Sequence, residues 1–334
     1  MFLLTVALLF TNPHWIPQSS GVTARLRGVS AVSERVAWAS GSKGTVLKTS
    51  DGGATWQKLT ITSEPLDFRD IDAIDERIVY ALSIGPGPAS RIYKSNDAGI
   101  TWTLQFRNDN PRAFLDAMSF WDAQHGIVFG DSIDGKFDIL MTENGGSVWR
   151  RLDPMRQPPA LANEGAFAAS GTNIAVFGPN HAWIGTGAAG RARVLRTSDR
   201  GRTWQISETP LAAGPSTGIF SVAFRDATHG VIVGGDYTKE GEAQNNLAFT
   251  SDGGITWTLA QGLRGFRSVV AYVPKMKTPT LVAIGPSGSD YSTDDGRTWQ
   301  AIEGPGFDTF SFARSKPIGW AAGAQGGLAR LSFD

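Results

Sequence analysis

An eight-residue motif that recurs six times constrains the fold of this chain more than any other feature of its sequence. Each copy has Ser or Thr first, Asp or Asn third, glycine fifth and tryptophan last, as in TSDGGATW (49–56). The final tryptophans, at positions 56, 102, 149, 204, 257 and 299, are 42 to 55 residues apart. Internal repeats on about this scale are typical of solenoids, propellers and similar arrays.

The third copy indicates what the motif does. There Asn144 replaces the Asp and Val148 replaces a Thr, whereas Gly146 and Trp149 remain. A calcium site or a catalytic carboxylate would not tolerate this exchange, but a turn would, because Asp and Asn both hydrogen-bond the nearby backbone. Glycine supplies a positive φ, and tryptophan fills an apolar groove. We therefore interpret the motif as structural, with this role assigned to Asp51, Asp97, Asn144, Asp199, Asp252, Asp294, Trp56, Trp102, Trp149, Trp204, Trp257 and Trp299.

The spacing of the copies predicts the architecture. Each interval holds four short strands, with inner strands expected at 26–32, 68–74, 114–120 and 219–224. The residues after Trp299 supply three more strands but no further motif, and Trp15 lies 41 residues before Trp56. The sequence thus predicts an all-β, seven-bladed propeller of four-stranded antiparallel blades, a single domain over residues 13–334. Its ring would be closed by the N-terminal strand joining the C-terminal blade, which removes exposed sheet edges.

Composition excludes several classes of function. Thirty-one basic and 31 acidic residues give no net charge, so no nucleic-acid partner is expected. The chain has no cysteine, which excludes disulfides, thiolate zinc sites and thiol catalysis. No cofactor and no metal are expected. His125 and His229 occupy equivalent turn positions, and we interpret them as turn residues.

The first residues, MFLLTVALLF, are apolar except for Thr5 and too few to span a bilayer. Residues 1–12 resemble the core of a secretory signal without its basic leader or cleavage site. We expect a periplasmic or secreted protein, with no membrane span in the mature chain. A misassigned start or a buried strand are the alternatives.

The motif resembles the Asp-box, or BNR repeat, of sialidase-like propellers. Together with F-x-D-A-x-H-G units at 120–126 and 224–230, it resembles the photosystem II stability and assembly factor family. This resemblance implies a monomeric propeller that binds a partner protein or a small polar or carbohydrate ligand without catalysis. The alternative is a sialidase-like glycoside hydrolase, although the early strand reads ARLRGVS and no F/Y-R-I-P segment is present.

A site is expected on one face of the ring. Loops between blades and loops joining second to third strands share that face, and the two longest repeat intervals add sequence there. Caps and bridges within turns are the alternative role for these residues. The candidate ligand-binding residues are Asp131, Asp134, Glu164, Ser170, Asp236, Tyr237, Asn246, Arg267 and Asp290.

A basic patch is a second candidate surface, because arginine suits the recognition of a protein partner and the family resemblance implies such a patch. An ordinary solvated surface is the alternative. The candidate residues are Arg107, Arg112, Arg151, Arg156, Arg191 and Arg193.

Overall fold

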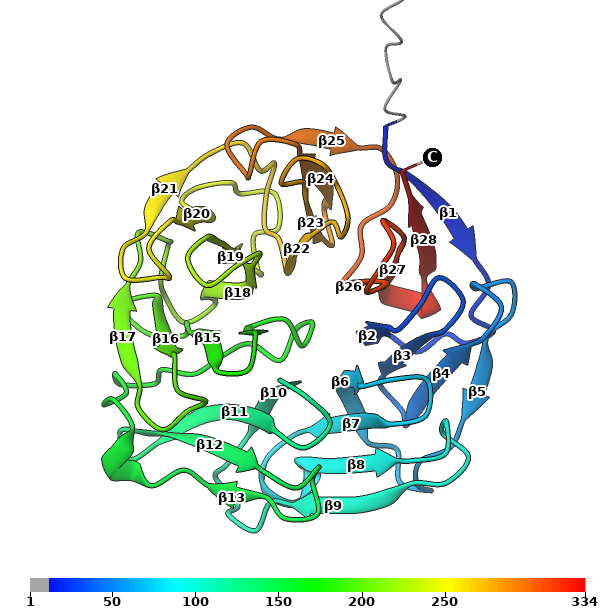
Figure 1. Cartoon of the computed structure of the whole chain (residues 1–334), viewed down its shortest axis with the longest axis horizontal. Coiled ribbons are helices and arrows are strands. Elements are labelled where there is room, and N and C mark those ends of the chain that lie inside the picture. Colours follow the sequence, from blue (N-terminus) through cyan, green and yellow to red (C-terminus); the bar gives the residue numbers. More distant parts are fainter. Residues whose placement is uncertain (1–11, 334) are drawn as a thin grey trace, which may run out of the picture.

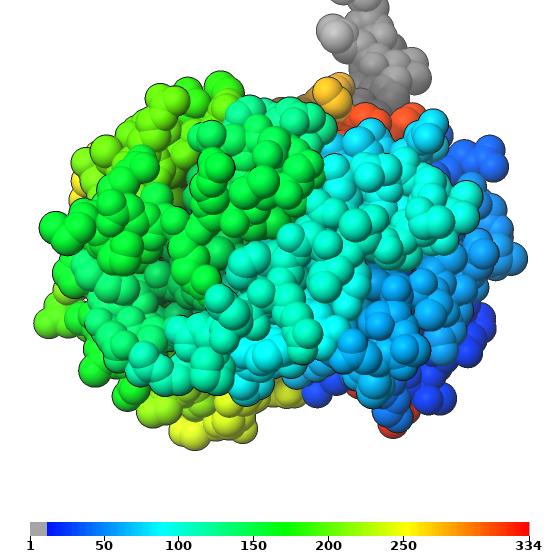
Figure 2. Space-filling view, turned by 90° about the horizontal axis from the view of Figure 1, so that it is seen from below, coloured from blue at the N-terminus to red at the C-terminus, as the bar shows by residue number. Residues whose placement is uncertain are grey.

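The computed structural model describes residues 12–333, which form seven four-stranded antiparallel sheets arranged in a ring, and we call the centre of this ring the channel (Figure 1). The predicted fold class is thereby confirmed. Seen from its edge, the ring is a disc on whose rim the cyan and green surfaces of neighbouring blades lie side by side (Figure 2).

Each blade runs from an inner strand at the channel to an outer strand at the rim. Blade one is β2 (Leu26–Ala31), β3 (Ala37–Gly41), β4 (Thr45–Thr49) and β5 (Gln57–Leu59). Blade two is β6 (Asp67–Ala73), β7 (Val79–Ile84), β8 (Arg91–Ser95) and β9 (Thr103–Arg107). Blade three is β10 (Leu115–Phe120), β11 (Gly126–Ile133), β12 (Lys136–Thr142) and β13 (Arg150–Arg151). Blade four is β14 (Ile174–Phe177), β15 (His181–Gly185), β16 (Arg193–Thr197) and β17 (Gln205–Glu208).

Blade five is β18 (Thr217–Phe224), β19 (Gly230–Asp236), β20 (Leu247–Thr250) and β21 (Thr258–Ala260). Blade six is β22 (Val269–Tyr272), β23 (Leu281–Gly285), β24 (Gly288–Ser292) and β25 (Gln300–Ile302). Blade seven is β26 (Thr309–Phe312), β27 (Gly319–Ala322), β28 (Leu328–Ser332) and β1 (His14–Gln18). Three single-turn 3-10 segments complete the described elements: Gly87–Ala89, Pro154–Arg156 and Ala324–Gly326.

The N-terminal strand closes the ring, as the sequence predicts. β1 pairs antiparallel with β28, with His14 opposite Ser332 and Gln18 opposite Leu328. Trp15 places its ring 4.8 Å from that of Phe307, in the core between blades six and seven. The expected apolar leader lies, apart from residue 12, outside the described residues. Within residues 12–333, no helix is long and apolar enough to cross a membrane.

The Asp and Asn residues of the eight-residue motif stabilise their own turns through hydrogen bonds. In the first copy, the carboxylate of Asp51 accepts the backbone N–H of Thr55 at 2.9 Å and its hydroxyl at 2.6 Å. These hydrogen bonds lower the pKa of Asp51 to about 2. In the third copy, Asn144 accepts the N–H of Val148 at 2.9 Å, so the amide reproduces the bond that closes the turn.

The tryptophans that end the eight-residue motif pack into the apolar cores within and between blades. Trp102 meets Trp38 of the preceding blade edge-on, with ring centroids 6.4 Å apart, and Trp149 meets Phe120 in the same way at 5.9 Å. Each motif therefore joins a polar turn to an apolar anchor.

Candidate functional site

The inner strands of four blades carry the same irregularity near their beginnings. The pairing of inner and second strand shifts by one residue between Leu26 and Gly28 in blade one, and at equivalent points in blades two, three and five. A β-bulge leaves one residue unpaired and redirects its side chain. The bulged residues are Arg27, Arg69, Asp116 and Phe220.

In blades one, three and five, glycine on the second strand makes room for the bulge. A Cβ atom at Gly234 would lie 1.9 Å from the carbonyl oxygen of Gly218, and one at Gly41 would lie 2.2 Å from that of Arg25. No side chain fits at such distances, because the two backbones touch. In these three blades the bulge depends on the glycine opposite it, whereas in blade two Ser83 lies opposite Phe68.

The long connection between β13 and β14, residues 152–173, enters the channel; we call it the crossing segment. Ser170 donates its hydroxyl to the carbonyl of Ser268 at 2.8 Å, and Thr309 donates to the carbonyl of Ser170 at 3.1 Å. Arg69 donates to the carbonyl of Ala168 at 3.1 Å. The segment thus contacts blades two, six and seven as well as the two blades that it joins.

Two carboxyl groups of blade three lie beneath the crossing segment. Asp116 is buried, and Asp131 lies close enough to raise its pKa further; both receive a hydrogen bond from the backbone N–H of Ala166. Burial raises the pKa of Asp131 to about 6 and that of Asp116 well above its usual range. Desolvation therefore favours the neutral form of Asp116.

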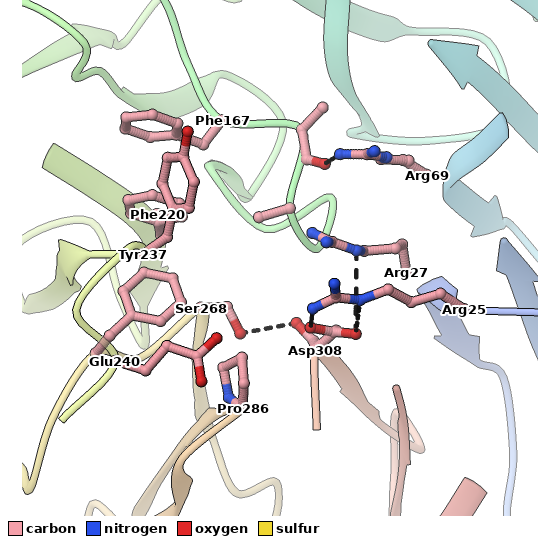
Figure 3. Close-up of a pocket in the computed structure, with 13 residues that line it drawn as sticks. Arg25, Arg27, Arg69, Phe167, Phe220, Tyr237, Glu240, Ser268, Pro286 and Asp308 are labelled. Atoms are coloured by element: carbon pink, nitrogen blue, oxygen red, sulfur yellow. Dashed lines mark hydrogen bonds and ion pairs between the residues drawn. The ribbon is translucent and has the colours of Figure 1, made fainter. Parts of the chain in front are cut away.

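A cavity of about 360 Å³ opens at the mouth of the channel, with two chemically different walls (Figure 3). Three guanidinium groups form one wall, and aromatic rings from the crossing segment and blades five and six form the other. Blades one, two, five and six, the crossing segment and the connection into blade seven all contribute residues to the lining. The lining residues are Arg25, Arg27, Arg69, Phe167, Ala168, Ala169, Phe220, Tyr237, Glu240, Phe266, Ser268, Pro286 and Asp308.

The arginines of this pocket differ in how well they are paired. Arg25 binds the carboxylate of Asp308 through two hydrogen bonds of 2.7 Å, and Arg69 binds Asp67 at 2.9 Å. Arg27 lies 4.0 Å from Asp308, and its Nε atom is buried with no hydrogen-bond partner within residues 12–333. Burial lowers the pKa of Arg27 to about 10, so it is still a cation at neutral pH. Arg27 is the cation whose pairing is least complete.

The aromatic wall is preformed. Phe167 of the crossing segment stacks on Phe220, with centroids 4.0 Å apart and planes 4° from parallel. Phe266 meets Phe220 edge-on at 4.6 Å. Tyr237 lies at the opening of the pocket, with its ring 6.0 Å from that of Phe167, and is 49% exposed. The wall therefore presents a rigid apolar surface with one accessible ring.

Of the nine residues that the sequence analysis proposed for ligand binding, Tyr237 alone lines this pocket. Glu164 is buried in an ion pair with Arg193 and also accepts the hydroxyl of Thr186 at 2.7 Å, so its carboxylate is not offered to a ligand. Asp290 and Arg267 likewise form a buried pair at 2.6 Å.

The remaining candidates serve local structure. Asp236 accepts the backbone N–H and the hydroxyl of Thr238, so it caps its own turn. Asn246 is buried and donates to the carbonyl of Gly265 at 2.6 Å. Asp134 pairs with Arg112 at 2.6 Å, and both side chains are exposed. Asp131 and Ser170 lie beneath or within the crossing segment, next to the pocket but not in its lining.

The proposed basic patch is largely neutralised. Arg112 binds Asp134, Arg151 binds Asp138 at 2.9 Å, and Arg191 binds Glu208. Arg193 is buried with Glu164, and Arg156 donates to the carbonyl of Arg202 at 2.8 Å. Arg107 is exposed at the end of β9. These side chains do not form one continuous cationic surface.

The histidines keep to their turns. His125 and His229 each place Nδ1 within 3.0 Å of an aspartate three residues earlier in the same turn. No group of three or more His, Cys, Asp or Glu residues that could hold a metal ion occurs in the described part of the chain.

Solved structures with this architecture are numerous, and several of them match almost the whole chain. YCF48 bound to a D1 peptide is 19% identical, with 98% of this chain and 99% of that chain covered at a TM-score of 0.67. The chain has the fold of the YCF48 propellers. YCF48 from Cyanidioschyzon merolae is 18% identical, with 95% and 98% covered at a TM-score of 0.65. The resemblance to photosystem II assembly factors is thus confirmed at the level of the fold.

Sequence comparison gives a narrower match. No family model matches the chain. A probable oligoxyloglucan-reducing end-specific xyloglucanase of Neosartorya fischeri is 35% identical over 96 residues. That stretch is 28% of this chain and only 11% of the enzyme, so the chain spans a small part of that relative.

Sequence reasoning missed most of this pocket because it searched the polar loops. The signal that it passed over lies at the inner strands, where an apolar residue is followed by arginine at Leu26–Arg27 and Phe68–Arg69. A glycine at the facing end of the second strand, Gly41 in blade one, would have marked the bulge.

Proposed function

We propose that this chain is a non-catalytic binding propeller that holds a segment of a partner protein, or a small polar ligand, in the pocket at the channel mouth. The observation that carries the proposal is Arg27, a partly buried cation without a full set of partners that faces a preformed aromatic wall. Pockets that pair apolar walls with a few convergent polar groups are the usual form of ligand sites. A protein with the same fold, YCF48, is bound to a peptide, which supports a protein partner.

A glycoside hydrolase is the second candidate, favoured by the local match to a xyloglucanase. Hydrolysis of this kind needs two carboxyl groups free to act as acid and as base or nucleophile. The pocket contains Glu240 and Asp308, and Asp308 is already bound bidentately by Arg25. A carboxylate held in this way is poorly suited to proton transfer, so the pocket favours binding.

Export, and a monomeric state, belong to the same proposal. Export rests on the apolar leader alone, and fractionation of the source cells tests it.

The function itself is tested by affinity capture from an extract of the source organism, with wild-type protein compared against two pocket variants and one remote variant. We expect proteins that are captured by wild type and by Arg150→Gln, at the rim, to be lost with Arg27→Gln and with Tyr237→Ala. Unchanged capture by both pocket variants would contradict the proposal.

The hydrolase alternative is tested in parallel with aryl glycosides and xyloglucan oligosaccharides. We expect no turnover by the wild-type protein. Turnover that disappears in Glu240→Gln, while its melting temperature is unchanged, would replace binding by catalysis.

A further inference from the structure

The chemistry of the two walls indicates which kind of ligand the pocket binds. This inference rests on the proposed binding function. The cationic wall has one incompletely used group. Arg25 is occupied by Asp308, and Arg69 by Asp67 and the crossing segment. The side chain of Arg27 is 19% exposed, and its guanidinium lies beside those of Arg25 and Arg69 (Figure 3). A partly buried cation of this kind favours an anionic oxygen that binds in a planar, charge-assisted arrangement.

The charge of the lining selects the kind of anion. Arg25, Arg27 and Arg69 contribute three positive charges, and Glu240 and Asp308 contribute two negative charges, so the lining carries one net positive charge. Glu240 is exposed on the aromatic side, across from the arginines. A second negative charge on the ligand would be repelled there. The pocket therefore suits a single carboxylate better than a phosphate dianion.

The opposite wall selects the body that carries this carboxylate. Phe167 and Phe220 are locked in a stack, while Tyr237 leaves part of its ring accessible. Offset or edge-on contacts with a further ring are favourable on such a surface. At about 360 Å³ the cavity is near the lower end of the range for ligand pockets, which suits one or two residues of a chain rather than a folded surface.

We propose that the pocket recognises an aromatic side chain that carries a free carboxylate beside it. The carboxylate binds Arg27, and the ring packs against Tyr237 and Phe167, which the buried Phe220 supports by stacking. A polypeptide that ends in an aromatic residue has this chemistry, and so has a free aromatic acid of the size of an acylated amino acid. Glu240 repels a second anionic group at the opening of the pocket.

The proposal is tested by calorimetric titration of the purified protein with N-acetylphenylalanine, its amide and N-acetylalanine. We expect the acid to bind, and the amide and the alanine derivative each to bind at least about tenfold more weakly, since each lacks one of the two contacts. Equal binding of acid and amide, or no binding of the acid up to about 10 mM, would overturn the proposal.

A peptide of sequence Gly-Ser-Gly-Ser-Phe, with a free or an amidated end, separates the two sources. Tighter binding of the free-acid peptide than of N-acetylphenylalanine assigns the pocket to chain termini, and equal binding assigns it to small aromatic acids. Preference for the amidated peptide would contradict both.

Variants locate the binding. We expect Arg27→Gln to weaken binding of the acid about tenfold and binding of the amide little, whereas Tyr237→Ala weakens both and Arg150→Gln neither. Tyr237 is exposed, so its variant folds even if Arg27→Gln does not. Acid binding unchanged in Tyr237→Ala overturns the proposal. If partner capture depends on Arg27 but none of these probes binds, the ligand class fails and the binding function stands.

Discussion

At Gly234 the lack of a side chain lets two stretches of backbone touch. The carbonyl of Gly218 occupies the position where a Cβ would stand, and the nitrogen of Phe220 would lie 3.2 Å from that atom. Phe220 is the bulged residue that carries the stacked centre of the aromatic wall. One glycine on a second strand therefore sets the direction of a side chain in the pocket.

We expect Gly234→Ala to lower the free energy of unfolding by about 1–3 kcal/mol, because the added methyl group overlaps backbone that cannot move alone. Urea denaturation measures the change. Gly241→Ala is the matched control, since a Cβ there meets nothing within 4 Å. Equal urea midpoints for the two variants would show that the close approach at Gly234 is not rigid.

Among the connecting elements, the crossing segment contributes both an apolar side chain to the pocket and a cover over two buried carboxyl groups. It brings Phe167 to the pocket and covers the carboxyl groups of Asp116 and Asp131. A carboxyl group whose pKa is raised in the folded state binds its proton more tightly there than in the unfolded chain. Its contribution therefore favours folding at low pH and is lost as the pH rises from about 4 toward 6.

We expect Asp131→Asn to be more stable than wild type at pH 7, by on the order of 1–3 kcal/mol, because the amide needs no desolvated charge. The difference should shrink as the pH falls from about 6, the raised pKa of Asp131, to its ordinary value of 3.8. Unfolding free energies measured between these values test this.

Asp134→Asn is the control for this pH dependence. Asp134 is exposed, and its hydrogen bonds to Arg112 lower its pKa, so that variant should lose rather than gain stability at neutral pH. A pH-independent difference between Asp131→Asn and wild type would mean that Asp131 does not titrate in this range.

The fold was predictable because its signal is periodic and local. Each eight-residue motif specifies a turn and an anchoring tryptophan, and the six copies leave one strand at the N-terminal end and three at the C-terminal end, which together define a seventh blade. The pocket was less predictable because its residues come from strand positions whose direction depends on a one-residue shift in pairing. Glu164 shows the difficulty: as a loop carboxylate it looks available, but Arg193 lies 29 residues later in sequence and buries it.

At the scale of the whole molecule, stability depends on one five-residue pairing. β1 contributes Trp15 to the core between blades six and seven and covers the outer edge of β28. The rest of blade seven has no other outer strand in the described chain.

We expect deletion of residues 1–24 to lower the free energy of unfolding by at least about 3 kcal/mol, since it removes a large aromatic anchor and one full ladder. The exposed edge of β28 should also cause association. Thermal unfolding and size-exclusion chromatography measure both effects, with deletion of residues 1–12 as the control. Equal melting temperatures for the two deletions would contradict closure by β1.

The same closure sets an order in time. During synthesis β1 leaves the ribosome first and its partner β28 last, so the N-terminal strand waits as an unpaired edge while six blades are made. The ion pair between Arg25 and Asp308 likewise joins an early residue to a late one. The pocket is therefore assembled only after Asp308 has been made, and a chain truncated or stalled before that residue presents no complete site to a partner.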